Sequence, residues 1–142
     1  MRVVFADTHY WVALANQRDQ KHKQARQLRE EFRRERAFLL TSELVLAEFL
    51  AFFSSYGPPM RKAASQMVED VLAAAKELQG VKVEWQSEEL FKSGLKFYGD
   101  RLDKGYSLTD CVSMTILNRE GLKEVATNDK HFTQEGFSIL IP

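Results

Sequence analysis

The stretch VVFADTHYW (residues 3–11) sets the direction of the fold. Its first four residues are apolar, which predicts a short buried strand over Val3–Ala6. An acidic residue, Asp7, follows at once, and Thr8–Asn16 then has the pattern of a helix. A strand that leads directly into a helix is the opening of a βαβ unit, so the chain is expected to begin a parallel sheet.

Outward from this stretch, short apolar segments continue to alternate with helical ones. Further strands are expected at Ala37–Leu40, Val81–Trp85, Glu124–Ala126 and Ser138–Ile141. Further helices are expected at Lys21–Arg36, from a cap at Thr41 or Ser42 through Phe53, and at Arg61–Gln79, Ser87–Tyr98 and Ser107–Glu120. The run Gly57-Pro58-Pro59 is expected to end the helix that runs through Phe53. The alternation predicts an α/β fold, in which helices cover both faces of a mostly parallel sheet.

The composition indicates one domain over residues 1–142 and narrows the classes of function. The chain is 44% hydrophobic and 28% charged, with a formal net charge of +0. A domain that holds nucleic acid by charge alone would be strongly basic, so local clusters or a partner would have to hold such a substrate. Cys111 is the single cysteine, and no apolar run approaches the length of a membrane span or a signal peptide. We therefore expect a cytoplasmic protein that has no disulfide and does not enter a membrane.

Four acidic residues stand in apolar surroundings, where a solvated charge is not expected. They are Asp7 in VFADTH, Glu48 in LVLAEFLAFF, Asp110 in SLTDCVSMTIL and Asp129 in EVATNDKHF. Burying a carboxylate is costly unless something compensates it, and converging carboxylates are commonly compensated by Mg²⁺ or Mn²⁺. All four acids follow strands or lie on helices that could face the carboxyl edge, where open α/β sheets form their sites. The pattern predicts a metal-dependent phosphodiester hydrolase.

Each acid also has a purely structural interpretation. Asp7 can cap the helix that follows it, and Asp110 ends the pattern SLTD, which matches a capping box. Glu48 can be a buried side chain with an ordinary partner, and Asp129 can be a turn residue. None of these interpretations explains the other three acids, so the metal prediction rests on the four together.

The same segments resemble the PIN-domain ribonucleases, in particular the VapC-like toxins of bacterial and archaeal toxin–antitoxin pairs. The resemblance runs through VVFADTHYWVALANQRDQKHKQA, TSELVLAEFL, SLTDCVSMTIL and ATNDKHFTQEGFSIL, and so covers nearly the whole chain. It implies a PIN-like three-layer α/β/α sandwich with a mostly parallel five-stranded sheet. It also implies endonucleolytic cleavage of RNA with Mg²⁺ or Mn²⁺ as cofactor. Many relatives carry another acid a turn after the third, where this chain has Ser113 and Met114, so a second metal ion is not implied.

The resemblance assigns roles to individual residues. The catalytic and metal-binding set would be Asp7, Glu48, Asp110 and Asp129, with supporting hydroxyls from Thr8, Ser107 and Thr127. Apart from the resemblance, contacts to the RNA backbone are expected from Arg18, Lys21, Lys104, Lys130 and His131, because these residues bracket the predicted site edge. Unpaired bases are expected to stack on Tyr10, Trp11 or Tyr106, because proteins commonly read RNA loops by stacking.

The expected partners are an RNA substrate, a small antitoxin protein and a second copy of the chain. The segment Leu44–Tyr56 and its neighbours are too apolar and aromatic for a helical hairpin fully in water, and exposed apolar patches mark interfaces. We therefore expect this segment to bind a partner, as a homodimer interface, an antitoxin groove or both.

Two other functions are compatible with a small α/β domain. One is a catalytically weak or inactive PIN-like binding module that is retained for its partner. The other is a receiver-like signalling domain, which would need adjacent acids after the first strand, an aspartate after the third and a lysine after the last. Here Asp7 stands alone, Trp85 and Gln86 follow the third strand, and the sequence ends at Pro142.

Overall fold

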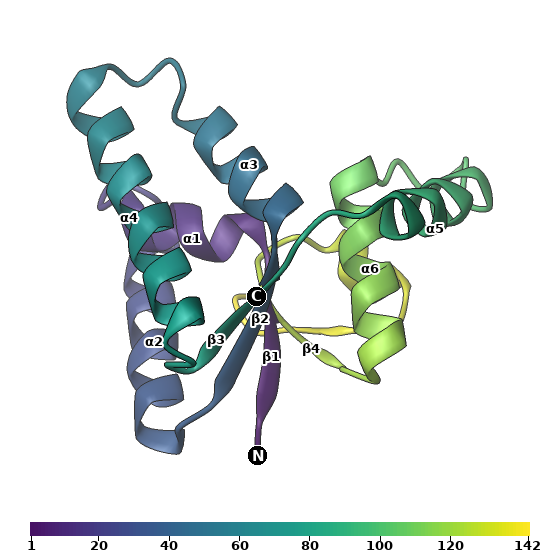
Figure 1. Cartoon of the computed structure of the whole chain (residues 1–142), viewed down its shortest axis with the longest axis horizontal. Helices are drawn as coiled ribbons and strands as arrows, with labels where there is room; N and C mark the ends of the chain where they lie inside the picture. The colour runs from purple at the N-terminus through teal and green to yellow at the C-terminus, as the bar shows by residue number, and fades with distance from the viewer.

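The computed structural model describes all 142 residues, which form one sheet surrounded by helices (Figure 1). The strands are β1 (Val3–Ala6), β2 (Phe38–Ser42), β3 (Val81–Glu84), β4 (Glu124–Ala126) and β5 (Ser138–Ile139). The helices are α1 (Thr8–Ala15), α2 (His22–Glu35), α3 (Glu43–Phe52), α4 (Pro58–Lys76), α5 (Glu88–Gly99), α6 (Leu108–Glu120) and α7 (His131–Gln134). None of these helices has the length and apolar character needed to cross a lipid bilayer.

The strands lie in the order β3-β2-β1-β4-β5, and every neighbouring pair is parallel. In Figure 1, α1, α2 and α4 lie on one side of the sheet, and α5 and α6 lie on the other. The predicted α/β/α sandwich with a five-stranded sheet is therefore confirmed, with a sheet that is wholly parallel. Because all strands run the same way, their carboxyl ends meet at one edge, which is where such sheets form their sites.

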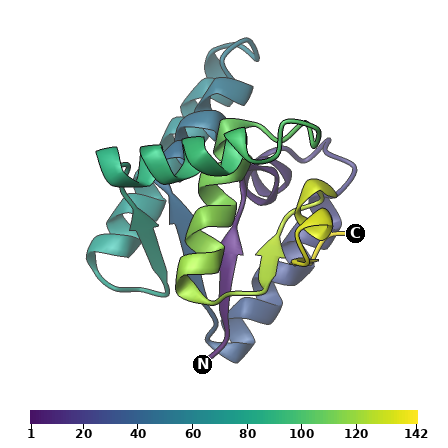
Figure 2. The same cartoon turned by 90° about the vertical axis from the view of Figure 1, so that its right-hand side faces the viewer.

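Helix α6 is buried on almost all sides, and this packing fixes the position of its first turn. It lies against the face of the sheet (Figure 2), and α5 packs on its outer side. Gly94 of α5 makes this close approach feasible, since a Cβ atom there would lie 2.5 Å from Cγ2 of Val112. The first turn of α6 is thereby held near the carboxyl edge of the sheet.

Element boundaries differ from the sequence expectations in ways that have local causes. The prolines Pro58 and Pro59 begin α4 rather than end α3, because the first turn of a helix needs no backbone N–H donor from them. Ser42 is the cap of α3, accepting a hydrogen bond from the Val45 N–H at 3.1 Å. Thr41 instead donates its hydroxyl to the Ala6 carbonyl oxygen at 2.8 Å. The short helix α7 was not expected from the sequence.

Candidate functional site

Three aspartates meet at the carboxyl edge of the sheet. Asp7 follows β1, Asp129 lies in the segment after the adjacent strand β4, and Asp110 is in the first turn of α6. Thr127 connects two of them: its Oγ1 donates to Asp7 Oδ2 at 2.8 Å and accepts from the Asp129 N–H at 3.1 Å. The adjacent parallel strands β1 and β4 therefore bring two carboxylates together, and α6 adds the third.

Asp110 forms the capping box that the sequence allowed and also contacts a neighbouring side chain. Its N–H donates to Ser107 Oγ at 3.0 Å, and its Oδ2 accepts from the Ser107 N–H at 3.1 Å, which completes the capping box. The same Oδ2 lies 3.2 Å from Nδ1 of His131. The cap does not compete with a functional role, because it fixes the direction in which this buried carboxylate points.

Capping does not account for Asp7. The residue occupies the N-cap position of α1, but its side chain forms no capping hydrogen bond. Its carboxylate is buried and accepts a hydrogen bond from Thr127. Burial raises the pKa of Asp7 to about 7, the Thr127 hydrogen bond opposes that rise, and the charges of Asp110 and Asp129 add to it. The folded chain thus holds a carboxylate whose charged form is poorly compensated.

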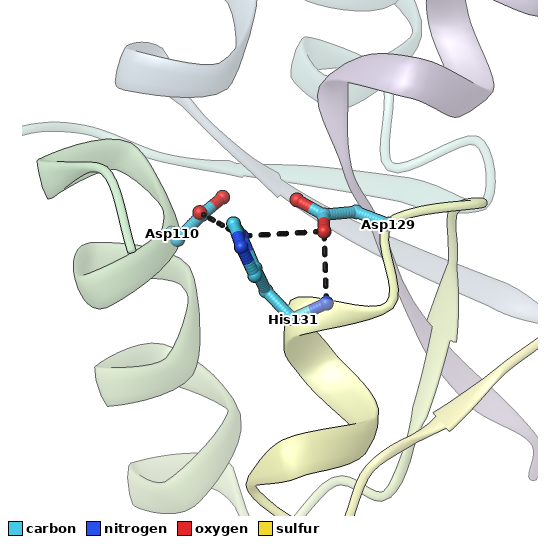
Figure 3. Close-up of side chains that lie close together, drawn as sticks. All are labelled: Asp110, Asp129 and His131. Atoms are coloured by element: carbon cyan, nitrogen blue, oxygen red, sulfur yellow. Dashed lines mark hydrogen bonds and ion pairs between the residues drawn. The ribbon is translucent and has the colours of Figure 1, made fainter. Parts of the chain in front are cut away.

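His131 lies between the other two carboxylates (Figure 3). Its Nδ1 is 3.2 Å from Asp110 Oδ2 and 3.4 Å from Asp129 Oδ1. The backbone N–H of His131 also donates to Asp129 Oδ1 at 2.9 Å, so the turn interpretation of Asp129 is correct as well. Together Asp110, Asp129 and His131 offer two oxygens and one nitrogen that all lie within 4.8 Å of one another.

The donor set suits a hard divalent cation. Burial and the neighbouring Asp129 raise the pKa of Asp110, although the Ser107 amide and His131 oppose that rise. Neither lysine nor arginine pairs with any of the three aspartates, and His131 is their sole basic partner in an ion pair. Clustered carboxylate oxygens without a permanent counter-charge are the ligands that Mg²⁺ and Mn²⁺ take. We conclude that the residues present fit the predicted metal.

Glu48 and the three expected hydroxyl groups differ in their burial and in their hydrogen bonds. Glu48 is half-buried on α3 and forms neither a hydrogen bond nor an ion pair, so its part in the site stays a prediction. Thr127 contacts Asp7 directly, and the Ser107 hydroxyl is used in the capping box. The Thr8 hydroxyl is buried beside Asp7 and has no hydrogen-bond partner.

Most of the basic side chains expected to contact RNA are accessible to solvent. Arg18, Lys104 and Lys130 are exposed. Lys21 is half-buried, and its Nζ donates to the carbonyl oxygen of Pro142 at 2.8 Å. His131 is in the acidic cluster itself rather than on the surrounding surface.

The expectation that Tyr10, Trp11 or Tyr106 stacks on RNA bases is wrong. These rings are 1%, 7% and 5% exposed, respectively, because each completes the interior packing. The indole N–H of Trp11 donates to Thr41 Oγ1 at 3.3 Å, for example. By contrast, Trp85 lies just after β3 at the carboxyl edge and is 58% exposed.

A supporting network beside the cluster also escaped the sequence analysis. The Tyr106 hydroxyl donates to Glu135 Oε2 at 2.8 Å, and Arg101 Nε donates to Glu135 Oε1 at 3.0 Å. The ring of Tyr106 packs edge-to-face on His131, with centroids 5.3 Å apart. The one sequence signal for the grouping is the spacing in NDKHF, which places His131 two residues after Asp129.

Comparison with known families identifies the class of protein to which this fold and this acidic edge belong. The family model of the PIN domain matches residues 4–137, so this chain belongs to the PIN domain family. Membership confirms the resemblance seen in the sequence and excludes the receiver-like alternative.

Individual relatives extend the match over the whole chain. The 23S rRNA-specific endonuclease VapC20 of Mycobacterium tuberculosis, from strains CDC 1551 / Oshkosh and ATCC 25618 / H37Rv, is 26% identical over 141 residues, which is 99% of either protein. The crystal structure of Mycobacterium tuberculosis VapC20, described as a sarcin-ricin loop cleaving toxin, matches this structure with a TM-score of 0.78. That match covers 98% of this chain and 99% of the crystallised one, at 26% identity.

Proposed function

We propose that the chain is a metal-dependent endoribonuclease and the toxin of a type II toxin–antitoxin pair. The observation that carries the proposal is the meeting of Asp7, Asp110 and Asp129 at one sheet edge without a lysine or arginine to neutralise them. Membership of the PIN domain family and the full-length similarity to a 23S rRNA-specific endonuclease support the same activity.

In this proposal Asp7, Glu48, Asp110 and Asp129 hold Mg²⁺ or Mn²⁺. When bound, such a cation polarises a phosphoryl oxygen and lowers the pKa of an attacking water. Thr127 and the capping box keep the carboxylates in fixed directions before substrate arrives. The buried, unpartnered Thr8 hydroxyl is proposed as a supporting group beside Asp7.

We propose a structured ribosomal RNA as the class of substrate, because the chain is similar over its length to a 23S rRNA-specific endonuclease. The exposed side chains of Arg18, Lys104 and Lys130 would contact phosphates. Trp85 replaces the three buried aromatics as the candidate for base stacking, since its ring is exposed at the same edge. Proteins that read RNA in this way select unpaired loops, whose bases can leave the helical stack.

The experiment compares cleavage of 23S rRNA fragments by the purified full chain in Mn²⁺, in Mg²⁺ and in EDTA. Cleavage is expected with either metal and should be absent in EDTA and in Asp110→Asn. In Asp110→Asn the amide oxygen can still accept the capping-box hydrogen bond from the Ser107 N–H, so the variant should keep its melting temperature. Cleavage in EDTA would disprove metal dependence, and RNA binding without cleavage in any condition would favour the inactive binding module.

We further propose that the chain forms a homodimer and is neutralised by a small antitoxin protein. The segment Leu44–Tyr56 is partly exposed as expected: Phe49 and Phe53 are buried, whereas Phe52 and Tyr56 are exposed. A second apolar stripe runs along α5 and just beyond it. It consists of Phe91, Leu95, Tyr98 and Leu102, at helical spacing and all exposed. Apolar side chains gathered in this way mark an interface.

Sedimentation of the wild type and of Leu95→Glu tests the dimer. We expect the wild type to sediment as a dimer and the variant as a monomer, because a buried charge at an interface is costly. Lys92→Glu, on the polar side of the same helix, provides the matched control and should leave the dimer intact. A monomeric wild type would refute the homodimer.

A further inference from the structure

The imidazole of His131 lies where a ligand would be, between two carboxylates of the candidate metal centre. We propose that His131 supplies a nitrogen ligand through Nδ1, which makes the site select Mn²⁺ over Mg²⁺. The inference rests on the proposed metal-dependent function and adds to it a ligand and a metal preference. It changes the role predicted for His131 from an RNA contact to a metal contact.

The spacing of the three donor atoms matches that of ligands around one ion. In an octahedral site with bonds of about 2.1 Å, adjacent ligand atoms are about 3.0 Å apart and opposite ones about 4.2 Å apart. His131 Nδ1 lies 3.2 Å from Asp110 Oδ2 and 3.4 Å from Asp129 Oδ1. All three donor atoms are within 4.8 Å of one another, so small side-chain shifts would bring them to the spacing of ligands on one ion.

Contacts on two sides set the position of the His131 ring. Tyr106 packs against it edge-to-face, and Tyr106 is itself buried and bonded to Glu135. Arg101 pairs with Glu135 at 3.0 Å and completes this support. At the other end, the backbone N–H of His131 is bonded to Asp129. These contacts restrict rotation of the ring and keep Nδ1 close to both carboxylates.

The chemistry of the donor atoms predicts the metal. Mg²⁺ is a hard cation that binds oxygen and keeps several of its waters, so an imidazole adds little to its affinity. Imidazole favours the first-row transition ions, whose affinity for a given site rises from Mn²⁺ towards Cu²⁺. A site of carboxylates plus one imidazole should therefore bind Mn²⁺ more tightly than Mg²⁺, and Co²⁺ more tightly than Mn²⁺.

A competing role for His131 predicts effects of the opposite sign. In the metal-free chain a protonated Nδ1 can donate to the two carboxylates and partly neutralise them. If that were its whole role, the side chain would have to leave before a cation could bind. Removing the imidazole would then leave the affinity for Mn²⁺ unchanged or increase it.

The test is electron spin-echo envelope modulation on Mn²⁺ bound to the metal-free, full-length chain, with affinities measured from the signal of free Mn²⁺. The wild type is expected to show coupling to one ¹⁴N nucleus, and His131→Asn is expected to lose it. His131→Asn should weaken Mn²⁺ binding by about tenfold or more, the size of effect seen when the support of a metal ligand is removed. Binding of Mg²⁺, measured by competition, should change much less.

His9→Asn is the matched control. His9 also lies at the carboxyl edge, where its Nδ1 accepts a hydrogen bond from the Asn128 N–H at 3.2 Å. We expect this variant to keep the ¹⁴N coupling and the Mn²⁺ affinity of the wild type. Bound Mn²⁺ without ¹⁴N coupling in the wild type would overturn the nitrogen ligand while leaving the nuclease proposal intact. Failure of the wild type to bind any Mn²⁺ would overturn both.

Discussion

Three carboxylates lie at each end of the sheet, but only those at the amino end are neutralised by an arginine. At the amino end, the Arg2 guanidinium just before β1 pairs with three glutamates. The distances are 2.7 Å to Glu31, 2.8 Å to Glu35 and 2.9 Å to Glu124. These acids are between 34% and 45% exposed, so water also stabilises their charges.

At the carboxyl end the situation is reversed. Asp7, Asp110 and Asp129 meet without an arginine or lysine, and Asp7 and Asp110 are buried. The fold itself therefore does not force acidic residues to remain uncompensated, since a neutralised cluster lies at the amino end of β1 and an uncompensated one at its carboxyl end. An uncompensated cluster at the edge where α/β sheets form sites therefore supports the proposal of a cation site there.

The largest effect is expected on catalysis, and it should be confined to one end of the sheet. Asp7→Asn keeps the size of the side chain but removes a charge, and we expect cleavage of RNA to fall by about a hundredfold or more, since metal stabilisation of a transition state is worth several kcal/mol. Glu124→Gln makes the same chemical change at the amino end and should leave the cleavage rate unchanged. Equal losses in both variants would mean that charge in general, rather than this site, governs the rate.

The next effect is on stability as a function of pH. The pKa of Asp7 is raised to about 7 in the folded chain from an ordinary value of 3.8. The folded state therefore holds this proton more tightly than the unfolded state, so its contribution to stability is complete below pH 3.8. That contribution is lost as pH rises through about 7. The raised pKa of Asp110 acts in the same direction.

In metal-free protein we expect the free energy of unfolding to fall between pH 5 and pH 7 by on the order of 2 kcal/mol through Asp7, given about 1.4 kcal/mol per pH unit for one proton. Denaturant unfolding in EDTA measures it. Asp7→Asn should lose this slope and be the more stable protein at pH 8. An identical slope in the variant would show that Asp7 is not the group that titrates.

Addition of Mn²⁺ should stabilise the protein through the cluster at the carboxyl end of the sheet and not through the one at the amino end. A ligand at a hundred times its dissociation constant stabilises the state that binds it by about 2.7 kcal/mol. Thermal melts should show this gain for the wild type and for Glu124→Gln, and should lose it in Asp110→Asn. If the gain persists in Asp110→Asn, Mn²⁺ binds elsewhere on the chain.

The fold was largely predictable because its signals are local. Short apolar runs such as Val3–Ala6, followed by amphipathic helices, leave few arrangements other than a parallel sheet between helical layers. The errors arose where one residue type has two positional meanings. The prolines Pro58 and Pro59 are found both after helices and in their first turns, and sequence alone did not show that Gly57 precedes a new helix.

The site was predictable in part, and the limit was tertiary. The strand ends placed Asp7 and Asp129 together, and the capping pattern placed Asp110 at the start of its helix. Nothing local indicated that the ring of His131 would lie between two carboxylates, because α7 and its neighbour Tyr106 are brought together only by the folded chain. For the same reason the burial of the aromatic side chains expected to bind RNA was not foreseen.

The smallest effect should come from removing the arginine that neutralises the amino end. Arg2→Met keeps an apolar stem over the Phe32 ring, where the guanidinium carbon lies 5.4 Å from the centroid, and leaves three glutamates without a partner. Because the pairs are partly exposed, we expect a loss of about 1 kcal/mol, or a melting temperature lower by about 3 °C. Added salt should shrink the difference from wild type, since it screens the repulsion among the glutamates. Cleavage and Mn²⁺ affinity should not change, and a loss of either would show that the two ends of the sheet are coupled.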